Sequence, residues 1–373
     1  MELFYYTSTD TLYYVLSKGD IFATNIRYMN DSEEYINGLQ ELYELAQKKE
    51  LVTEWIKEKG LNESLLSRIE NTFTERNLKE NRETMEYYSI SFCEKNDILS
   101  QWAIYAKESG VSIKMNFEKE LYEFSTKSIE KEQLAKWNLL PQKVYYFTYQ
   151  SMKQDEEQYK RVAYEVLNQL YEESAKDQAE WKNERWRYIS TLVKRYDFYQ
   201  EKEYRLVFEP NETTFPPYIE YRPDKKVLKP YLDIECDRCF GWPIWEVMIG
   251  PGFNQQVVYD SVEHLLNNGK LKVGIKNTED YVKRVKEYLQ PNSKDLETCK
   301  EYKELIGQIQ QSDRSNQITL EEAKIYIVQK LREIRKEVCE NNSYSKDIKN
   351  YFNKYHFTES GVVITKSSIP YIF

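Results

Sequence analysis

The sequence predicts an α+β fold in which short β-strands are separated by long charged helices. The apolar spacing changes repeatedly from every second residue, which is typical of strands, to every third or fourth, which is typical of helices. A hydrophobic content of 40% with 31% charged residues is the composition of a globular protein. At 373 residues the chain is long enough for one elaborate domain or two ordinary ones. Burial of apolar surface therefore does not limit its stability.

The N-terminal residues predict a strand, a helix and a second strand. Residues 3–8 are rich in β-prone side chains. Thr9 or Asp10 is suited to cap the helix that follows, and Gly19 is suited to end it. Residues 20–26 then predict the second strand. This pattern places two neighbouring strands at the start of the fold.

The middle of the chain continues the alternation. Further strands are predicted at 87–93, 111–117, 143–149, 204–208 and 246–249, with a weaker candidate at 271–275. Helices are predicted at about 31–81, 98–107, 118–136, 150–198 and 257–266. Gly250-Pro251-Gly252 is a strong signal for the end of a strand.

Residues 278–355 predict a nearly continuous helical stretch. Thr319 and Glu322 form a capping box at the start of its longest helix. One apolar stripe follows: Leu320, Ile327, Leu331, Ile334 and Val338. The stripe is interpreted as packing surface, with a partner-binding face for an antitoxin or another protein as the alternative.

The C-terminal residues 361–365 return to a strand pattern after about eighty helical residues. Because such a tail has no neighbouring strand in the sequence, we expect it to pair with the earlier strands. The prediction is a discontinuous α+β core of residues 1–275 plus 356–373. Helical insertions are expected at about 31–86 and 150–198, and a further helical insertion at 278–355.

Composition excludes several classes of protein. No window approaches the roughly 18 apolar residues of a membrane helix, and the first residues lack the basic and apolar regions of a secretory signal. Five scattered cysteines fit a reducing compartment, so we expect a cytoplasmic protein with no membrane association. Cys236 and Cys239 form a lone CxxC, and His264 and His356 are the only histidines. No metal is expected, because structural zinc normally takes four such ligands.

Residues 181–205 stand apart from the acidic chain, whose net charge is −9. Seven Lys and Arg face four Asp and Glu there, and 7 − 4 leaves a local charge of +3, with aromatic residues interleaved. Cations beside aromatic rings suit phosphates and unstacked bases. The predicted nucleic-acid-binding residues are Arg185, Trp186, Arg187, Lys194 and Arg195. An amphipathic helix with long cationic side chains along its apolar surface explains the same pattern.

Five blocks of sequence belong together: Leu3–Ser8, Met29–Glu34, Ser91–Asp97 with Ser100–Ala106, Glu201–Arg205 and Lys366–Tyr371. In this order they resemble the bacterial family known as domain of unknown function 2971. The family pattern has an aromatic-Tyr-Thr-Ser start, an Asn-Asp-Pro-Phe-Glu turn, Ser-Glu then Trp-x-x-Tyr-Ala, Glu-x-Glu-x-Arg and a Ser-x-Ile-Pro end. This chain departs from it at Tyr5, Ser32 and Ile104, where His, Pro and His are frequent. A mechanism that needs imidazole at those positions is therefore not supported.

The layout also resembles ADP-ribosyltransferases, particularly those that modify nucleic acids. That resemblance implies a mixed or antiparallel split sheet with long helical insertions, NAD as a substrate, and Glu203 as the catalytic residue at the start of a strand. Breaking the bond between nicotinamide and ribose leaves positive charge on the sugar, which a fixed carboxylate stabilises. Because strand side chains alternate, Glu201 faces the same side as Glu203 and is expected to orient or deprotonate the acceptor. The alternative is that both acids pair with Lys202 and Arg205 on a solvated strand edge.

The remaining NAD contacts are predicted by analogy with the same superfamily. Ribose contacts are expected from Tyr5, Tyr6 and Thr7, phosphate contacts from Asn25 or Arg27, and stacking on the nicotinamide ring from Trp102 or Tyr105. Trp102 and Tyr105 have core packing as their alternative.

These features predict a toxin or antiviral-defence effector that uses NAD to modify a macromolecule, RNA or DNA rather than protein. One alternative is a metal-dependent nuclease or phosphoesterase built on Asn30, Asp31, Glu33 and Glu34. The other is a non-catalytic interaction module acting through the charged helices 278–355.

Overall fold

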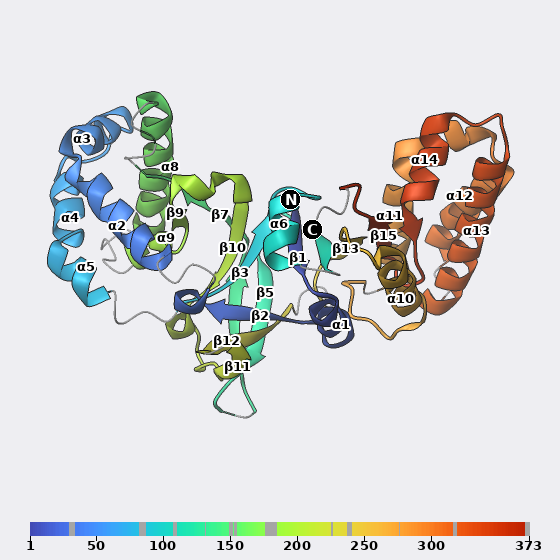
Figure 1. The fold of residues 1–373 in the computed structure, drawn as a ribbon, viewed down its shortest axis with the longest axis horizontal. Coiled ribbons are helices and arrows are strands. Elements are labelled where there is room, and N and C mark those ends of the chain that lie inside the picture. Colours follow the sequence, from blue (N-terminus) through green and yellow to red (C-terminus); the bar gives the residue numbers. More distant parts are fainter. Residues whose placement is uncertain are drawn as a thin grey trace. The chain divides into compact units, whose positions relative to one another are not determined.

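The computed structural model divides the chain into two compact units, each made of segments far apart in the sequence (Figure 1). It describes residues 1–29, 34–81, 87–106, 110–130, 132–148, 152, 155–175, 185–224, 227–236, 241–275, 277–315 and 319–369. The first unit comprises Met1–Ile21, Cys93–Phe124 and Glu235–Phe373, and the second comprises Phe22–Phe92 and Ser125–Ile234. The predicted core of 1–275 plus 356–373 is thus divided between the units, and the helices of 278–355 belong to the first unit.

The strands of the first unit follow the order β14-β15-β13-β4-β1. They are β1 (Glu2–Thr7), β4 (Val111–Asn116), β13 (Ile244–Ile249), β14 (His356–Phe357) and β15 (Val363–Lys366). Neighbouring strands are antiparallel, except that β13 and β15 run parallel. The N-terminal and C-terminal strands therefore lie in one run of paired strands. This confirms that the C-terminal strand pairs with earlier ones.

Helices of the first unit begin with α1 (Thr9–Lys18), α6 (Leu99–Tyr105) and α10 (Gln255–Asn268). The N-cap of α1 is Ser8, not Thr9 or Asp10, because the extended backbone at Ser8 lets its side chain accept a hydrogen bond from the Thr11 amide. Gly19 ends the helix, as predicted, with a left-handed φ of 85°.

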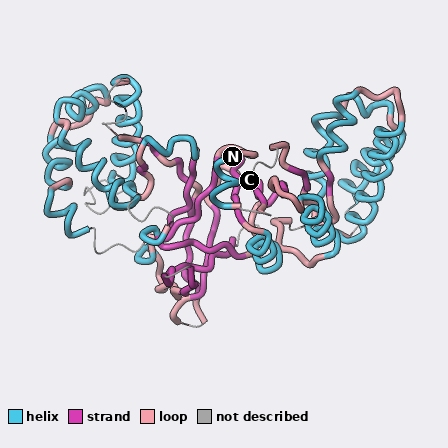
Figure 2. The backbone as a smooth tube through the Cα atoms, in the orientation of Figure 1, coloured by secondary structure: helices cyan, strands magenta, loops and turns pink. Residues whose placement is uncertain are grey.

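In its described part, the predicted stretch 278–355 forms four helices of the first unit. Figure 2 shows this region as mainly helix. These are α11 (Thr278–Leu289), α12 (Lys300–Ser315), α13 (Leu320–Glu340) and α14 (Lys346–Lys354), with the short 3-10 turns η4 (Gln290–Asn292) and η5 (Asp295–Thr298) between α11 and α12. Thr319 and Glu322 form the predicted capping box. The apolar stripe of α13 is buried against the neighbouring helices, apart from the half-buried Leu320. The packing interpretation of the stripe is therefore confirmed.

The second unit contains the strand order β3-β2-β12-β5-β6, with β10 paired to β3 and β7, and β11 paired to β12. Their bounds are β2 (Asp20–Asn25), β3 (Tyr88–Cys93), β5 (Tyr122–Lys127), β6 (Leu134–Leu139), β7 (Gln142–Lys143), β10 (Glu203–Phe208), β11 (Glu220–Asp224) and β12 (Val227–Cys236). A separate parallel pair joins β8 (Tyr145–Tyr146) to β9 (Val193–Lys194).

Its helices are α2 (Glu34–Gln47), α3 (Lys49–Glu58), α4 (Ser64–Thr72), α5 (Glu75–Asn81), α8 (Glu156–Ala175) and α9 (Arg185–Ser190), and the 3-10 segments are η1 (Ile26–Tyr28), η2 (Tyr196–Glu201) and η3 (Pro210–Glu212). They enclose a core that includes Trp55 and Trp186. The Trp55 indole donates to the Asn168 side chain at 3.0 Å. The helical prediction for 31–86 is thus met by four short helices in its described part.

Three secondary-structure predictions are wrong. Residues 118–136 were predicted as helix because Glu and Lys dominate them, but Tyr122 and Phe124 are buried at strand spacing in β5, as are Ala135 and Trp137 in β6. Within 150–198 a strand and a 3-10 segment follow α9, and β11 and β12 were not predicted. Residues 271–275 form no strand. For residues 118–136, burial against neighbouring strands outweighs local helix propensity.

Among the described helices, none has the length and apolar character that crossing a membrane demands.

Candidate functional site

The predicted catalytic residue Glu203 lies at the start of β10, with its side chain buried in the second unit. It is 6% exposed, and Arg205, two residues further along the same strand, is 0% exposed. The Arg205 guanidinium donates from Nε to Glu203 Oε1 and from Nη2 to Oε2, both at 2.8 Å. Such a bidentate ion pair fixes the position and orientation of the carboxylate.

Lys194 of β9 connects Glu203 to the second predicted catalytic residue, Glu201. Its ammonium lies 2.7 Å from Glu201 Oε2 and 3.3 Å from Glu203 Oε2, and 5.1 Å from the centre of the Phe198 ring. Glu201 ends η2, and Lys202 then adopts a left-handed φ of 48° before the strand begins. The structure thus brings the two carboxylates together on one cation.

Backbone contacts hold this ionic cluster of Lys194, Glu201, Glu203 and Arg205. The Glu203 amide donates to the Tyr146 hydroxyl at 2.8 Å, and its carbonyl accepts from the Val144 amide at 3.0 Å. Arg205 also donates to the Thr191 carbonyl at 2.5 Å. The sequence did not indicate Lys194 or Tyr146 as partners, because both come from separate segments.

Electrostatics keep Glu203 ionised. Burial alone would raise the pKa of its carboxyl, but the charges of Arg205 and Lys194 outweigh burial and lower the pKa to about 2. The alternative interpretation predicted pairing with Arg205 and Lys202 on a solvated edge. Arg205 is a partner, but Lys194 takes the second place and the cluster is buried. The arrangement holds the ionised Glu203 carboxylate at a fixed point between two cations.

Tyr6 and Trp102 come together in the first unit, where both are buried. The Tyr6 hydroxyl donates to the Lys95 carbonyl and accepts from the Ile98 amide, each at 3.1 Å. Trp102 meets the Tyr6 ring edge-on, with centroids 4.9 Å apart, and is 1% exposed. Trp102 therefore has the packing role that was its alternative.

Asp97 is the residue of this cluster that sequence reasoning missed. Its carboxylate accepts from the Trp102 indole and from the Ser368 amide and hydroxyl, each at 3.0 Å, and from the Ser367 hydroxyl. Burial alone would raise the pKa of the Asp97 carboxyl, but these hydrogen bonds outweigh burial and lower the pKa. Residues of the third and fifth sequence blocks therefore meet at this carboxylate, and Tyr6 of the first block packs against Trp102.

The other predicted NAD contacts are dispersed. In the first unit Thr7 is buried on β1, Tyr5 is half-buried and Tyr105 is 37% exposed. In the second unit the Asn25 side chain caps η1, where it accepts a hydrogen bond at 3.1 Å from the backbone amide of Arg27, an exposed residue. The structure describes each group within its own unit, so an NAD site that combines them stays a prediction.

The predicted nucleic-acid-binding residues largely pair with acids or lie in the core. Trp186 is buried edge-on to Phe73, with ring centroids 5.4 Å apart. Arg185 pairs with Glu209 and Glu212, and Arg195 pairs with Asp197 at 3.0 Å. These contacts resemble those expected for the amphipathic-helix interpretation. Residues 181–184 lie outside the part of the chain that the structure describes.

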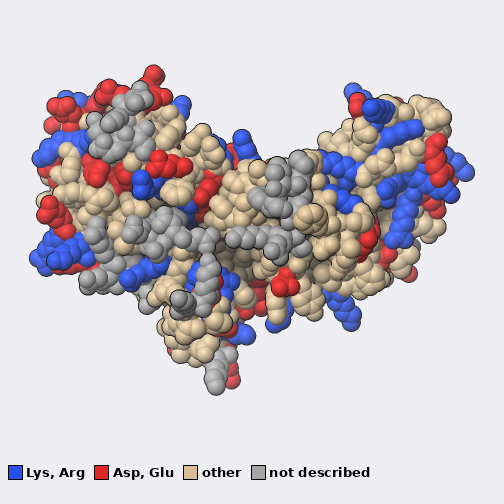
Figure 3. All heavy atoms as spheres, viewed as in Figure 1, with Lys and Arg blue, Asp and Glu red and all other residues tan. Residues whose placement is uncertain are grey.

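Arg187 differs, because its buried Nε has no hydrogen-bond partner among the described residues. On the face drawn in Figure 3, acidic and basic side chains lie side by side on both groups of helices.

The alternative metal ligands Asn30, Asp31 and Glu33, together with the side chain of Glu34, lie outside what the structure describes. The same is true of Cys239, whereas Cys236 is described and buried.

Glu246 of β13 is a buried carboxyl that we expect to make stability pH-dependent. Burial raises its pKa to about 7 despite nearby Lys114 and Lys354, and its Oε1 has no hydrogen-bond partner in the described residues. The folded state therefore favours the proton. The stability that comes from protonated Glu246 is complete below about pH 4.3 and is lost as pH rises through 7.

Between pH 5 and 8.5, ionisation of Glu246 should lower the free energy of unfolding by about 2–3 kcal/mol. Glu246→Gln should abolish this part of the pH dependence. Urea denaturation at both pH values measures this, with the exposed Glu235→Gln as control. An unchanged pH profile in Glu246→Gln would contradict the assignment.

One comparison with known proteins gives a match. A family model described as "Protein of unknown function (DUF2971)" matches residues 101–206, from α6 to β10, a stretch that includes Trp102, Glu201 and Glu203. No curated protein and no solved structure matches the chain. Over residues 101–206, this match supports the resemblance of the chain to the DUF2971 family.

Proposed function

We propose that this chain is an enzyme of the ADP-ribosyltransferase type, which consumes NAD and transfers ADP-ribose to a macromolecule. One observation carries the proposal: the Glu201 and Glu203 carboxylates converge on a single cation, 2.7 and 3.3 Å away. A position that holds an ammonium between two carboxylates also stabilises the positive sugar formed when nicotinamide leaves.

In the proposed reaction the bond between nicotinamide nitrogen and ribose carbon breaks, and its electron pair stays with nicotinamide. Glu203, held by Arg205, stabilises the resulting sugar cation. Glu201 accepts the proton of the acceptor, whose oxygen or nitrogen then bonds to the ribose carbon. Lys194 has to move aside when NAD binds, because Glu203 is only 6% exposed with the lysine in place.

The acceptor we propose is RNA or DNA, in keeping with a toxin or antiviral-defence effector. Support comes from the charge of segment 181–205. Since Arg185, Lys194 and Arg195 pair with acids, phosphates would have to compete with those carboxylates. The interaction-module alternative has less support, because the α13 stripe is buried against other helices.

Nicotinamide release from NAD tests the proposal. We expect release, and label transfer from NAD to RNA, DNA or protein fractions, to fall at least ~100-fold in Glu201→Gln and Glu203→Gln, because an interaction made only in the transition state is lost. Asp197→Asn is the matched control: it removes an exposed acid from the same 3-10 segment. Turnover that survives in Glu203→Gln, with thermal melting showing a folded protein, would exclude this residue as catalytic.

A further inference from the structure

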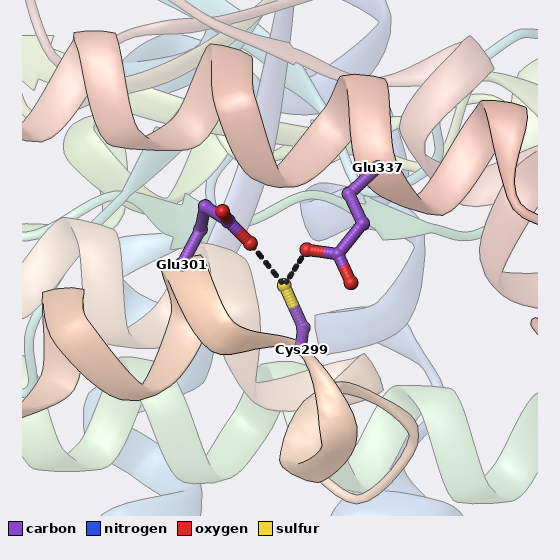
Figure 4. Close-up of side chains that lie close together, drawn as sticks. All are labelled: Cys299, Glu301 and Glu337. Atoms are coloured by element: carbon purple, nitrogen blue, oxygen red, sulfur yellow. Dashed lines mark hydrogen bonds between the residues drawn. The ribbon is translucent and has the colours of Figure 1, made fainter.

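Three potential metal ligands converge among the helices of the first unit, whereas the ionic cluster belongs to the second unit. Cys299 lies between η5 and α12, Glu301 lies in the first turn of α12, and Glu337 lies near the end of α13. Figure 4 shows the three side chains pointing toward one another. The Cys299 sulfur lies 3.1 Å from Glu337 Oε2 and 3.8 Å from Glu301 Oε2. All three potential ligand atoms lie within 4.8 Å of one another.

These distances match a tetrahedral metal. With Zn–S near 2.3 Å and Zn–O near 2.0 Å, two ligand atoms at the tetrahedral angle are separated by about 3.5 Å. The observed sulfur–oxygen distances of 3.1 and 3.8 Å lie on either side of that value. The two sulfur–oxygen distances therefore suit a metal placed between the thiol and the carboxylates.

An outer contact orients one of these ligands. The buried Tyr344 hydroxyl donates to Glu337 Oε1 at 3.0 Å, and this leaves Oε2 directed at the sulfur. Hydrogen bonding of a ligand's second oxygen is typical of metal sites, where it fixes the ligand's orientation.

The site combines a closed side with an open one. The Cys299 side chain is fully buried at 0% exposure. A groove of about 450 Å³ runs past both carboxylates and is lined by Lys300, Glu301, Glu333, Lys336, Glu337 and Glu340. The groove gives an ion access from solvent and leaves room for a water as fourth ligand.

We propose that Cys299, Glu301 and Glu337 bind a divalent transition metal of the zinc type, with water as the fourth ligand. The sulfur disfavours magnesium and calcium, which take oxygen ligands. On binding, the thiol proton is released to solvent and the thiolate joins the metal. No motif in the sequence indicated this site, because Cys299 and Glu337 are 38 residues apart. The bound metal ties the start of α12 to α13 and stabilises this helical group.

Cobalt(II) titration of the full chain, stripped of metal by a chelator, tests the site. A bound thiolate produces a sulfur-to-cobalt charge-transfer band, and tetrahedral geometry produces intense visible absorption. We expect both signals in the wild type, displaced by zinc. They should be lost in Cys299→Ser and weakened in Glu337→Gln, whereas Tyr344→Phe should lower affinity about 10–100-fold.

Cys339→Ser and Cys236→Ser are the controls, because each removes another thiol of the first unit. Both should bind cobalt like the wild type. Undiminished thiolate absorption in Cys299→Ser, or its loss in Cys236→Ser alone, would overturn the proposal. If Cys299→Ser does not fold, Glu301→Gln and Glu337→Gln decide, since wild-type affinity in both would also overturn it.

Discussion

Glu203→Ala is expected to lower the free energy of unfolding by about 3–5 kcal/mol, the typical cost of breaking a buried ion pair. The reason is Arg205, which is 0% exposed and donates two hydrogen bonds to the oxygens of this carboxylate. Without Glu203 its charge stays buried with much less compensation. Urea denaturation monitored by circular dichroism measures the loss.

Two variants separate this effect from a general cost of removing charge. Arg195→Ala breaks an ion pair whose side chains are 49% and 51% exposed, so it should cost at most about 1 kcal/mol. Glu203→Leu combined with Arg205→Met replaces the pair by apolar side chains and should recover much of the stability. If Glu203→Ala lost less than about 1 kcal/mol of unfolding free energy, the buried pair with Arg205 would contribute no more to stability than an exposed one.

The same ion pair sets a direction for acid sensitivity. The pKa of Glu203 is lowered to about 2 in the folded chain, because Arg205 and Lys194 outweigh the effect of burial. Its stabilising contribution is therefore complete above the unfolded value of about 4.3 and is lost as pH falls toward 2.

Asp97→Ala is expected to have the second large effect, with a loss of about 3 kcal/mol or more. Its carboxylate accepts hydrogen bonds from Trp102, Ser367 and Ser368, and bonds to charged groups contribute about 1.5–3 kcal/mol each, though not additively. The backbone φ of 57° adds strain for alanine. Hydrogen exchange at the Ser368 amide should rise with the loss of stability.

Matched variants separate the side chain from the backbone at this position. Asp97→Gly accepts the positive φ but lacks the carboxylate, so it should lose nearly as much stability as alanine. Asp97→Asn tolerates the same φ and keeps an acceptor oxygen, so it should lose the least. Equal stability of the glycine variant and the wild type would refute the role of the hydrogen bonds.

Elements defined by neighbouring residues were predictable. The capping box at Thr319 and Glu322, the stripe of α13 and the end of α1 at Gly19 all depend on side chains within a turn or two of each other. The β5 and β6 strands were missed because Glu and Lys favour a helix locally, while pairing with distant strands favours β structure.

The candidate sites were only half predictable. Strand alternation was expected to place Glu201 and Glu203 on one side, but Glu201 belongs to η2, and the two carboxylates meet through Lys194 instead. The pairing of Glu203 with Arg205 follows the alternative interpretation. No spacing rule connected Lys194 to them, because its position depends on the pairing of β9 with β8. Asp97 and Ser367 are 270 residues apart, and sequence patterns do not reach so far.

Residue order alone established the α+β class, most of the helices and a strand near Glu203, because backbone propensity and side-chain alternation act over a few residues. Tertiary structure decided the two-unit division, the burial of Glu203 between Arg205 and Lys194, and the meeting of Cys299 with Glu337. Those contacts close long loops whose entropy cost grows only slowly with length. Packing of the whole chain, not local preference, therefore selects which distant residues meet.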